Sequence, residues 1–458
     1  YYKTSGLFLL ILLFVTVSDW SIARRIYECK YSPSSDGAEG RGTGSAKVWL
    51  ALSVVIDLGL LCYFKYAYFF THVVNNLLGT EFAVFDIFAY VGNGFSESGR
   101  FMVDKIILPV GISFYLFQVM SYTIDVYRGL VKPVKSILDF GFYVSFFPGL
   151  VAGPIVRANE FIPQLYKPFC LSRRLAGLAV FWILNGLIKK IVLSDYLAVN
   201  IIDRVFENPL LFSGFENLFA LFAYSLQVYA DFSGYTDIAI GIAMLMGFYL
   251  PQNFDSPYKS RNPQEFWRRW HISLSTWFSD YVYIPLGGNR KGKIRKYLNI
   301  FIVFFLSGIW HGAAWNFVLW GLLYAALLLL EKFVPAVSKL PRVLSHVYVM
   351  LMVTLGFVLF NAESLSQVAS DVGGMFGFAG VPLVNQETLY YLASYGVLFV
   401  AGFIGATPIV RNTAKKLSGQ TLVTYLLRMI DGHGGVRSYQ KVSASGLVDT
   451  YRFTFADE

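Results

Sequence analysis

Long apolar segments alternate with short polar loops along most of the chain. They include positions 7–17, 48–64, 106–120, 175–187, 300–310, 317–330 and 389–404. Some approach the roughly 20 apolar residues that a helix needs to cross a bilayer, and the shorter ones fit tilted, buried or re-entrant helices in a larger bundle. The pattern therefore predicts an all-α polytopic membrane protein.

Composition and charge support this class. The chain is 55% hydrophobic and 15% charged, whereas soluble domains carry about 25% charged residues. Its net charge of +9 comes largely from short basic loops, such as 24–25, 173–174, 189–190 and 290–296. By the positive-inside rule we expect these loops on the cytoplasmic side of the membrane, and nucleic acid is not indicated as a partner. The three cysteines show no paired spacing, so neither a disulfide framework nor a zinc site is indicated.

The apolar pattern predicts a single transmembrane domain over residues 1–430. Residues 431–458 lose this periodicity, and we expect a cytoplasmic or disordered tail there. The chain begins with Tyr1 and without the pattern of a signal peptide. We expect earlier residues, including a first membrane helix, to precede it.

Ionisable groups at membrane depth are costly, so each is a candidate for function. Asp231, Tyr235 and Asp237 lie within an apolar stretch from 218 to 250. One interpretation is a polar cavity inside the helix bundle. The alternative is a helix break, with the carboxylates capping the helix that follows.

The segment 262–277 is predicted to form one helix that begins at Pro263. Arg268, His271 and Ser275 group on one face of this helix. The residues of the neighbouring apolar face are Trp267, Trp270, Leu274 and Trp277. The polar face suits a catalytic role, and the aromatic face also suits an anchor at the membrane interface.

His311 follows about ten mostly apolar residues. A neutral imidazole in such a place can take a proton from a hydroxyl nucleophile. Ser307, four residues earlier on the same helix face, could hold one ring nitrogen. Small residues such as Gly308 and Gly312 allow a substrate or another helix to approach. The alternative is a structural histidine in helix packing. His271 and His311 have no metal-ligand spacing, so we predict no metal site.

Together these segments resemble the membrane-bound O-acyltransferase (MBOAT) family, most closely its bacterial alginate O-acetyltransferase (AlgI-like) branch. The matching stretches lie in family order within residues 63–331. They are 63–66, 108–115, 122–129, 147–148, 152–157, 231–237, 265–277, 280–290 and 307–313.

The resemblance implies a ring of transmembrane and re-entrant helices around a central tunnel in a bacterial inner membrane. It assigns the family's hallmark histidine to His311 and its second characteristic polar position to His271. The residues expected to bind the donor or line the tunnel are Arg268, Ser275, Ser307, Trp310, Asn316, Asp231, Tyr235, Asn289 and Arg290.

The resemblance also implies the chemistry. Acetyl-coenzyme A, or another acyl-CoA, would be the donor substrate rather than a bound cofactor, and the acceptor would be an extracytoplasmic polysaccharide, either an alginate-like exopolysaccharide or a cell-wall glycan. The expected partners are an extracytoplasmic SGNH/esterase-like acetyltransferase, the polysaccharide synthesis machinery and membrane lipid.

Two other functions fit polar groups at membrane depth. A transporter or flippase of a glycan precursor or an acyl group would carry its substrate without thioester chemistry. A membrane scaffold for a glycan synthase would not need His311. Cleavage of an acyl thioester separates the enzyme from both alternatives.

Overall fold

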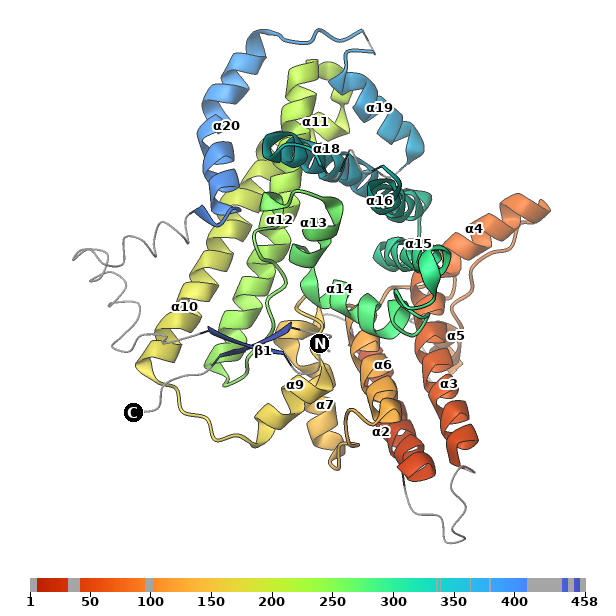
Figure 1. The fold of residues 1–458 in the computed structure, drawn as a ribbon. Coiled ribbons are helices and arrows are strands. Elements are labelled where there is room, and N and C mark those ends of the chain that lie inside the picture. The colour runs from red at the N-terminus through yellow and green to blue at the C-terminus, as the bar shows by residue number, and fades with distance from the viewer. Residues whose placement is uncertain are drawn as a thin grey trace.

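The computed structural model describes residues 6–31, 42–94, 102–334, 337, 339–362, 364–378, 380–409, 439–443 and 449–453. These residues are helical except for loops and one short hairpin (Figure 1). The first elements are η1 (Gly6–Phe8), α2 (Leu9–Tyr31), α3 (Gly42–Leu61), the π-helical turn η2 (Cys62–Tyr66), α4 (Ala67–Leu78) and α5 (Ile87–Gly94).

The middle of the chain contains the longest helix. Its elements are α6 (Ile112–Arg128), α7 (Ile137–Ser145), α8 (Phe147–Leu150), α9 (Ala158–Phe161), η3 (Ile162–Tyr166), α10 (Arg173–Leu187), η4 (Ile188–Asp195), η5 (Ala198–Ile202), α11 (Asp203–Glu207), η6 (Pro209–Leu211) and α12 (Gly214–Leu245).

The last part again alternates short and long helices. Its elements are η7 (Pro257–Lys259), α13 (Pro263–Arg269), α14 (Ile272–Phe278), η8 (Ser279–Tyr283), α15 (Gly292–His311), α16 (Trp315–Phe333), α18 (Arg342–Asn361), α19 (Leu365–Met375) and α20 (Gln386–Gly405).

Several of these helices are long and apolar enough to cross a membrane. The candidate spans among the described residues are Gly44–Leu78, Leu175–Glu207, Trp315–Phe333, Arg342–Asn361 and Gln386–Gly405. Large apolar side chains are also exposed along them, as at Val180 and Leu184 of α10 and Ile188 at the start of η4. Exposed apolar rows of this kind suit a lipid environment, and the prediction of an all-α polytopic membrane protein is confirmed.

Helix α12 carries the polar cluster at 231–237 without interruption. It begins with a capping box between Ser213 and Glu216 and continues to Leu245. The predicted alternative of a helix break is therefore wrong. The cluster is tolerated because lysines of η4 neutralise its carboxylates: Lys190 Nζ lies 2.6 Å from Asp231, and Lys189 Nζ lies 2.6 Å from Asp237.

The predicted single helix over 262–277 is also wrong. The chain is extended at Trp270 and left-handed at His271 (φ 44°), which separates α13 from α14. The aromatic residues of this segment pack against other aromatic residues inside the protein. Trp277 stacks on Phe117 with a centroid distance of 3.8 Å, and Trp267 packs edge-on against Tyr324.

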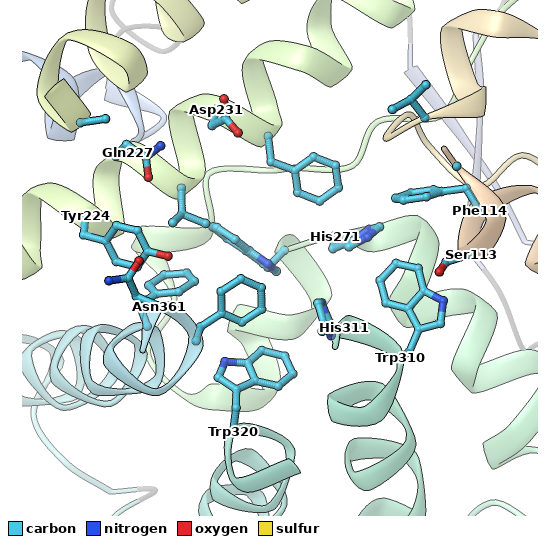
Figure 2. Close-up of a pocket in the computed structure, with 18 of the residues that line it drawn as sticks. Ser113, Phe114, Tyr224, Gln227, Asp231, His271, Trp310, His311, Trp320 and Asn361 are labelled. Carbon is cyan, nitrogen blue, oxygen red and sulfur yellow. The ribbon is translucent and has the colours of Figure 1, made fainter. Parts of the chain in front are cut away.

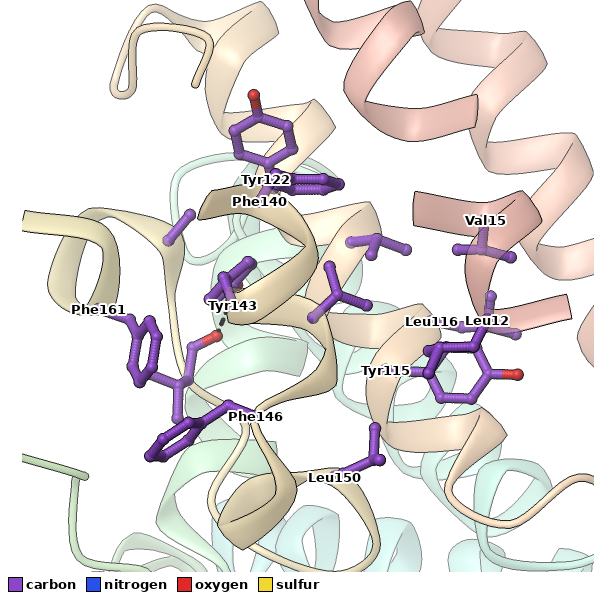
Figure 3. Close-up of a cluster of buried hydrophobic side chains, with 14 of the residues drawn as sticks. Leu12, Val15, Tyr115, Leu116, Tyr122, Phe140, Tyr143, Phe146, Leu150 and Phe161 are labelled. Atoms are coloured by element: carbon purple, nitrogen blue, oxygen red, sulfur yellow. Dashed lines mark hydrogen bonds between the residues drawn. The ribbon is translucent and has the colours of Figure 1, made fainter. Parts of the chain in front are cut away.

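Two large apolar clusters hold the bundle together. The first joins α2, α3, α6 and α7 and contains fully buried aromatic residues (Figure 3). Tyr143, for example, has no exposed surface, and its hydroxyl donates to the Val156 carbonyl at 2.9 Å. The second joins α12, α18 and α20. The cavity described below is bounded by elements of both.

The tail contains a hairpin that the sequence pattern did not predict. Strands β1 (Tyr439–Ser443) and β2 (Asp449–Phe453) pair antiparallel, with Tyr439 opposite Phe453. The other residues of the predicted tail 431–458 lie outside the described residues.

Candidate active site

A cavity of about 670 Å³ lies where the middle of α12 faces the ends of α15 and α18. It is lined by residues from most parts of the chain, including η2, α6, α12, α15, α16 and α18. His271, Trp310 and His311 lie close together at one side of it, and Tyr224, Gln227 and Asn361 lie at the other (Figure 2). Residues far apart in sequence thus meet at one site.

His311 is the last residue of α15, and its ring orientation is fixed. Nδ1 lies 2.7 Å from the backbone carbonyl oxygen of Ser307. A carbonyl can only accept, so Nδ1 carries the proton and the neutral ring keeps a lone pair on Nε2. Ser307 does hold one ring nitrogen, but through its backbone and not its hydroxyl. The rings of Trp320 and Phe360 pack against the imidazole at 4.8 and 5.5 Å.

The end of α15 is held in place by close helix packing. A Cβ on Gly308 would lie 2.4 Å from the Phe317 carbonyl oxygen and 3.1 Å from the Cα of Gly321. A Cβ on Gly312 would overlap the Phe317 ring. These two glycines therefore allow α16 to pack closely against the end of α15. The sequence had left open whether they admit a substrate or another helix.

His271 lies at the break between α13 and α14. Its side chain is buried, and its Nδ1 has no hydrogen-bond partner among the described residues. The ring packs edge-on against Phe232 at 4.7 Å and against Trp310 at 6.1 Å. Trp310 in turn contacts His311 at 5.0 Å, so one indole touches both histidines.

The loop at Asn253 holds the backbone that follows His271. The Ile272 N–H donates to the Asn253 carbonyl at 3.0 Å, and the Ser273 N–H donates to the Asn253 Oδ1 at 3.2 Å. The Ser273 hydroxyl accepts from the Ile155 N–H at 3.0 Å. A left-handed conformation is costly for a histidine, and these contacts from distant segments maintain it.

Of the other residues expected in the tunnel, Trp310 and Asp231 line the cavity. Ser307 contributes only through the carbonyl described above. Asn316 donates to the carbonyls of Leu359 and Ala362 and thereby joins α16 to the end of α18.

Seven of the nine expected residues lie outside the lining of the cavity. They are Ser307 and Asn316, described above, and Arg268, Ser275, Tyr235, Asn289 and Arg290. Arg268 and Arg290 are exposed. Ser275 donates to the Trp270 carbonyl, and Tyr235 packs at the edge of the first apolar cluster. Asn289 accepts from the Tyr283 hydroxyl at 2.5 Å in the turn before α15.

Some lining residues were not singled out as site residues from the sequence. They are Lys65, Ser113, Asp203, Tyr224, Gln227 and Asn361. Lys65 had the clearest signal, because it is a lysine at the end of a long apolar run. Ser113, Asp203 and Asn361 lie at or near helix ends, and Tyr224 and Gln227 lie in the middle of α12. Many polar groups at such positions have no function. Within the described ranges, no group of three or more His, Cys, Asp or Glu side chains could hold a metal ion.

The fold and site together define a polytopic membrane protein with two histidines at a cavity between its helices. Comparison with known proteins gives the family. The model of MBOAT, the membrane-bound O-acyltransferase family, matches residues 60–363. The chain belongs to this family and is an O-acyltransferase.

Curated relatives have names of envelope-modifying enzymes. A probable alginate O-acetylase AlgI of Azotobacter vinelandii is 40% identical over 88% of this chain and 76% of its own length. A peptidoglycan O-acetyltransferase of Helicobacter pylori is 34% identical over 74% of this chain and 66% of its own length. A teichoic acid D-alanyltransferase of Bacillus subtilis is 29% identical over 56% of this chain and 69% of its own length.

Proposed function

We propose that this O-acyltransferase takes an acetyl group from acetyl-coenzyme A on the cytoplasmic side of the membrane. The acetyl group then passes to a hydroxyl group for O-acetylation of an extracytoplasmic polysaccharide. The observation that carries the proposal is the fixed tautomer of His311. Its Nδ1–H is bound by the Ser307 carbonyl, which leaves Nε2 as a base at a cavity.

The chemistry is a direct acyl transfer. The acceptor hydroxyl oxygen attacks the thioester carbonyl carbon while Nε2 of His311 takes the hydroxyl proton. The carbonyl electrons move onto oxygen to form an oxyanion. When this intermediate collapses, the carbon–sulfur bond breaks, and the leaving thiolate takes the proton from His311. No covalent bond to the enzyme is required.

His271 is the second functional side chain of the proposal. A buried polar atom without a partner is costly, so the unpartnered Nδ1 of His271 favours a substrate contact. We assign it the positioning of the thioester or a hydrogen bond to the developing oxyanion. Ser275 and Arg268, which the sequence placed beside it, lie outside the cavity lining.

The envelope acceptor is supported by the names of the relatives, which concern alginate, peptidoglycan and teichoic acid. We propose a polysaccharide acceptor, with an extracytoplasmic SGNH/esterase-like acetyltransferase as the partner that completes the transfer. Exposed basic residues such as Lys291 and Lys293, beside Arg290, would attract the phosphates of the coenzyme.

The test is donor cleavage by purified full-length protein with labelled acetyl-coenzyme A. We expect His311→Gln to lower the rate by about 10²–10⁴-fold, the usual contribution of a general base. His346→Gln is the matched control, because the His346 Nδ1 also contacts a backbone carbonyl but the residue lies outside the cavity lining.

The control is expected to cleave the donor like the parent. A parent that transports a solute but never cleaves a thioester would establish the transporter alternative instead. Full activity in His311→Gln would show that another group is the base. A parent that cleaves no donor and transports no solute would fit the scaffold alternative.

A further inference from the structure

A π-helical turn places two consecutive side chains against the end of α15. Lys65 and Tyr66 are the last residues of η2, within the long apolar span Gly44–Leu78. The Tyr66 hydroxyl donates to the Ile309 carbonyl at 2.6 Å, and Lys65 Nζ donates to the Trp310 carbonyl. π-helical turns are uncommon and frequently occur at functional sites. This one brings a cation to the residue before His311.

The ammonium group of Lys65 keeps one donor free of these protein contacts. A lysine has three N–H donors. One serves the Trp310 carbonyl, and a second serves the Ser113 hydroxyl oxygen at 3.3 Å. Lys65 is half-buried and lines the cavity. The third donor is therefore available to a molecule that occupies this cavity.

Lys65 is also the one lysine or arginine among the described residues that line the cavity. The lining carboxylate of Asp231 already pairs with Lys190 at 2.6 Å. Over the described ranges, Lys65 itself forms no ion pair. A charge at membrane depth without a counter-ion is costly and marks a functional position.

We infer that Lys65 is a catalytic residue, whose third N–H donates to the oxyanion formed on the thioester carbonyl. This inference rests on the proposed acyl transfer. As the hydroxyl attacks, negative charge develops on the carbonyl oxygen, and a fixed cation stabilises that charge more than the neutral ground state. The proton still passes from the hydroxyl to His311 and then to the leaving thiolate. Lys65 therefore neither gives up nor takes a proton.

Three variants separate stabilisation of the oxyanion by Lys65 from a merely structural role in positioning the end of α15. Lys65→Gln keeps an N–H donor for the Trp310 carbonyl but removes the charge, and Lys65→Arg keeps the charge. Tyr66→Phe removes only the neighbouring contact with Ile309 and serves as the matched positional control. Each full-length protein is purified in detergent, and kcat and KM are measured with acetyl-coenzyme A.

For Lys65→Gln we expect kcat to fall by about 10²–10³-fold, the loss typical of an oxyanion donor, with KM for the donor within about threefold. Lys65→Arg should recover at least a tenth of the parental kcat. Tyr66→Phe should lose less than about tenfold.

A Lys65→Gln protein with parental kcat would overturn the inference and leave the proposed function intact. Equal losses in Lys65→Gln and Tyr66→Phe, without recovery in Lys65→Arg, would reduce Lys65 to a residue that positions α15. A parent that never cleaves acyl thioesters would overturn both the inference and the proposed function.

Discussion

At the scale of single residues, the site depends on backbone geometry as much as on side-chain chemistry. His311 needs the Ser307 carbonyl to fix its tautomer, and His271 needs a left-handed backbone to enter the cavity. For His271 the fixing contacts come from Asn253, almost twenty residues earlier in the chain. Residues that touch no substrate therefore decide where the imidazoles lie.

Asn253→Ala tests this dependence. The change removes the Oδ1 that accepts from the Ser273 N–H, while the Asn253 carbonyl still accepts from Ile272. We expect donor cleavage to fall by about tenfold, and the loss of one buried hydrogen bond to cost about 1 kcal/mol of stability. Cleavage rate and melting temperature are measured in parallel, with Asn76→Ala as the control at an exposed position. A lower melting temperature with unchanged cleavage would show that His271 does not need this contact.

At the residue level, the sequence signal is strongest where one residue type stands out from its surroundings. A histidine in an apolar helix is conspicuous, and His311 lies at the cavity as this signal suggested. The cation was assigned to Arg268, which is exposed, whereas Lys65 lines the cavity. The direction of the Lys65 side chain depends on the π-helical turn, which no periodicity shows.

At the scale of elements, α19 shows how a short helix can carry a pH-sensitive group. α19 packs on α12, where a Cβ added at Gly374 would lie 3.3 Å from the Asn217 side chain. Asp371 on this helix is 2% exposed, and its Oδ1 has no hydrogen-bond partner within the described ranges. Burial raises the pKa of Asp371 from 3.8 to about 6.

The raised pKa of Asp371 determines how the stability of the protein changes with pH. A folded pKa above the unfolded one means that the folded state binds the proton more tightly. The unfolding free energy is therefore highest below about pH 4, falls as the pH rises through 6, and then levels off. We expect Asp371→Asn to flatten this fall, so that its melting temperature exceeds that of the parent at pH 8.

The measurement is a series of melting temperatures between pH 4 and pH 8 for parent, Asp371→Asn and the exposed control Glu81→Gln. The control should follow the parent. If Asp371→Asn melts below the parent at pH 8, the ionised carboxylate has a stabilising partner and its burial is not the dominant effect.

The structure overturns the single helix predicted over 262–277 and the helix break that was one of two interpretations of 231–237, each for a tertiary reason. The sequence 262–277 has helical periodicity, but backbone contacts with Asn253 favour a break at His271. The cluster at 231–237 looks like an interruption, but α12 continues because Lys189 and Lys190 of another element neutralise its carboxylates. Local patterns show neither set of partners.

At the scale of the whole molecule, charge is distributed between two ends. The helical stretch from α10 to α11 covers Leu175–Glu207, and its ends lie on opposite sides of the bundle in Figure 1. Arg173 and Lys167 lie at the end where α10 begins, and Asp203, Arg204 and Glu207 lie at the other. Two of the predicted basic loops are wrong: Arg24 and Arg25 lie within α2, and Lys189 and Lys190 lie within η4, where they pair with the carboxylates of α12. The class of fold was predictable from composition, because lipid acts on the whole chain. The shape of the cavity was not, because it depends on contacts between distant helices.

The positive-inside rule orients these two ends. Cys170, which is exposed near Arg173, should face the cytoplasm, and Leu211, which is 77% exposed beyond α11, should face the outside. In a Cys29→Ser, Cys62→Ser background, a membrane-impermeant maleimide should leave Cys170 unlabelled in intact cells and label it after the membrane is opened. With Cys170→Ser added, Leu211→Cys should be labelled in intact cells. The reverse labelling pattern would show that the basic end at Lys167 and Arg173 faces the outside, and it would contradict the orientation expected from the positive-inside rule.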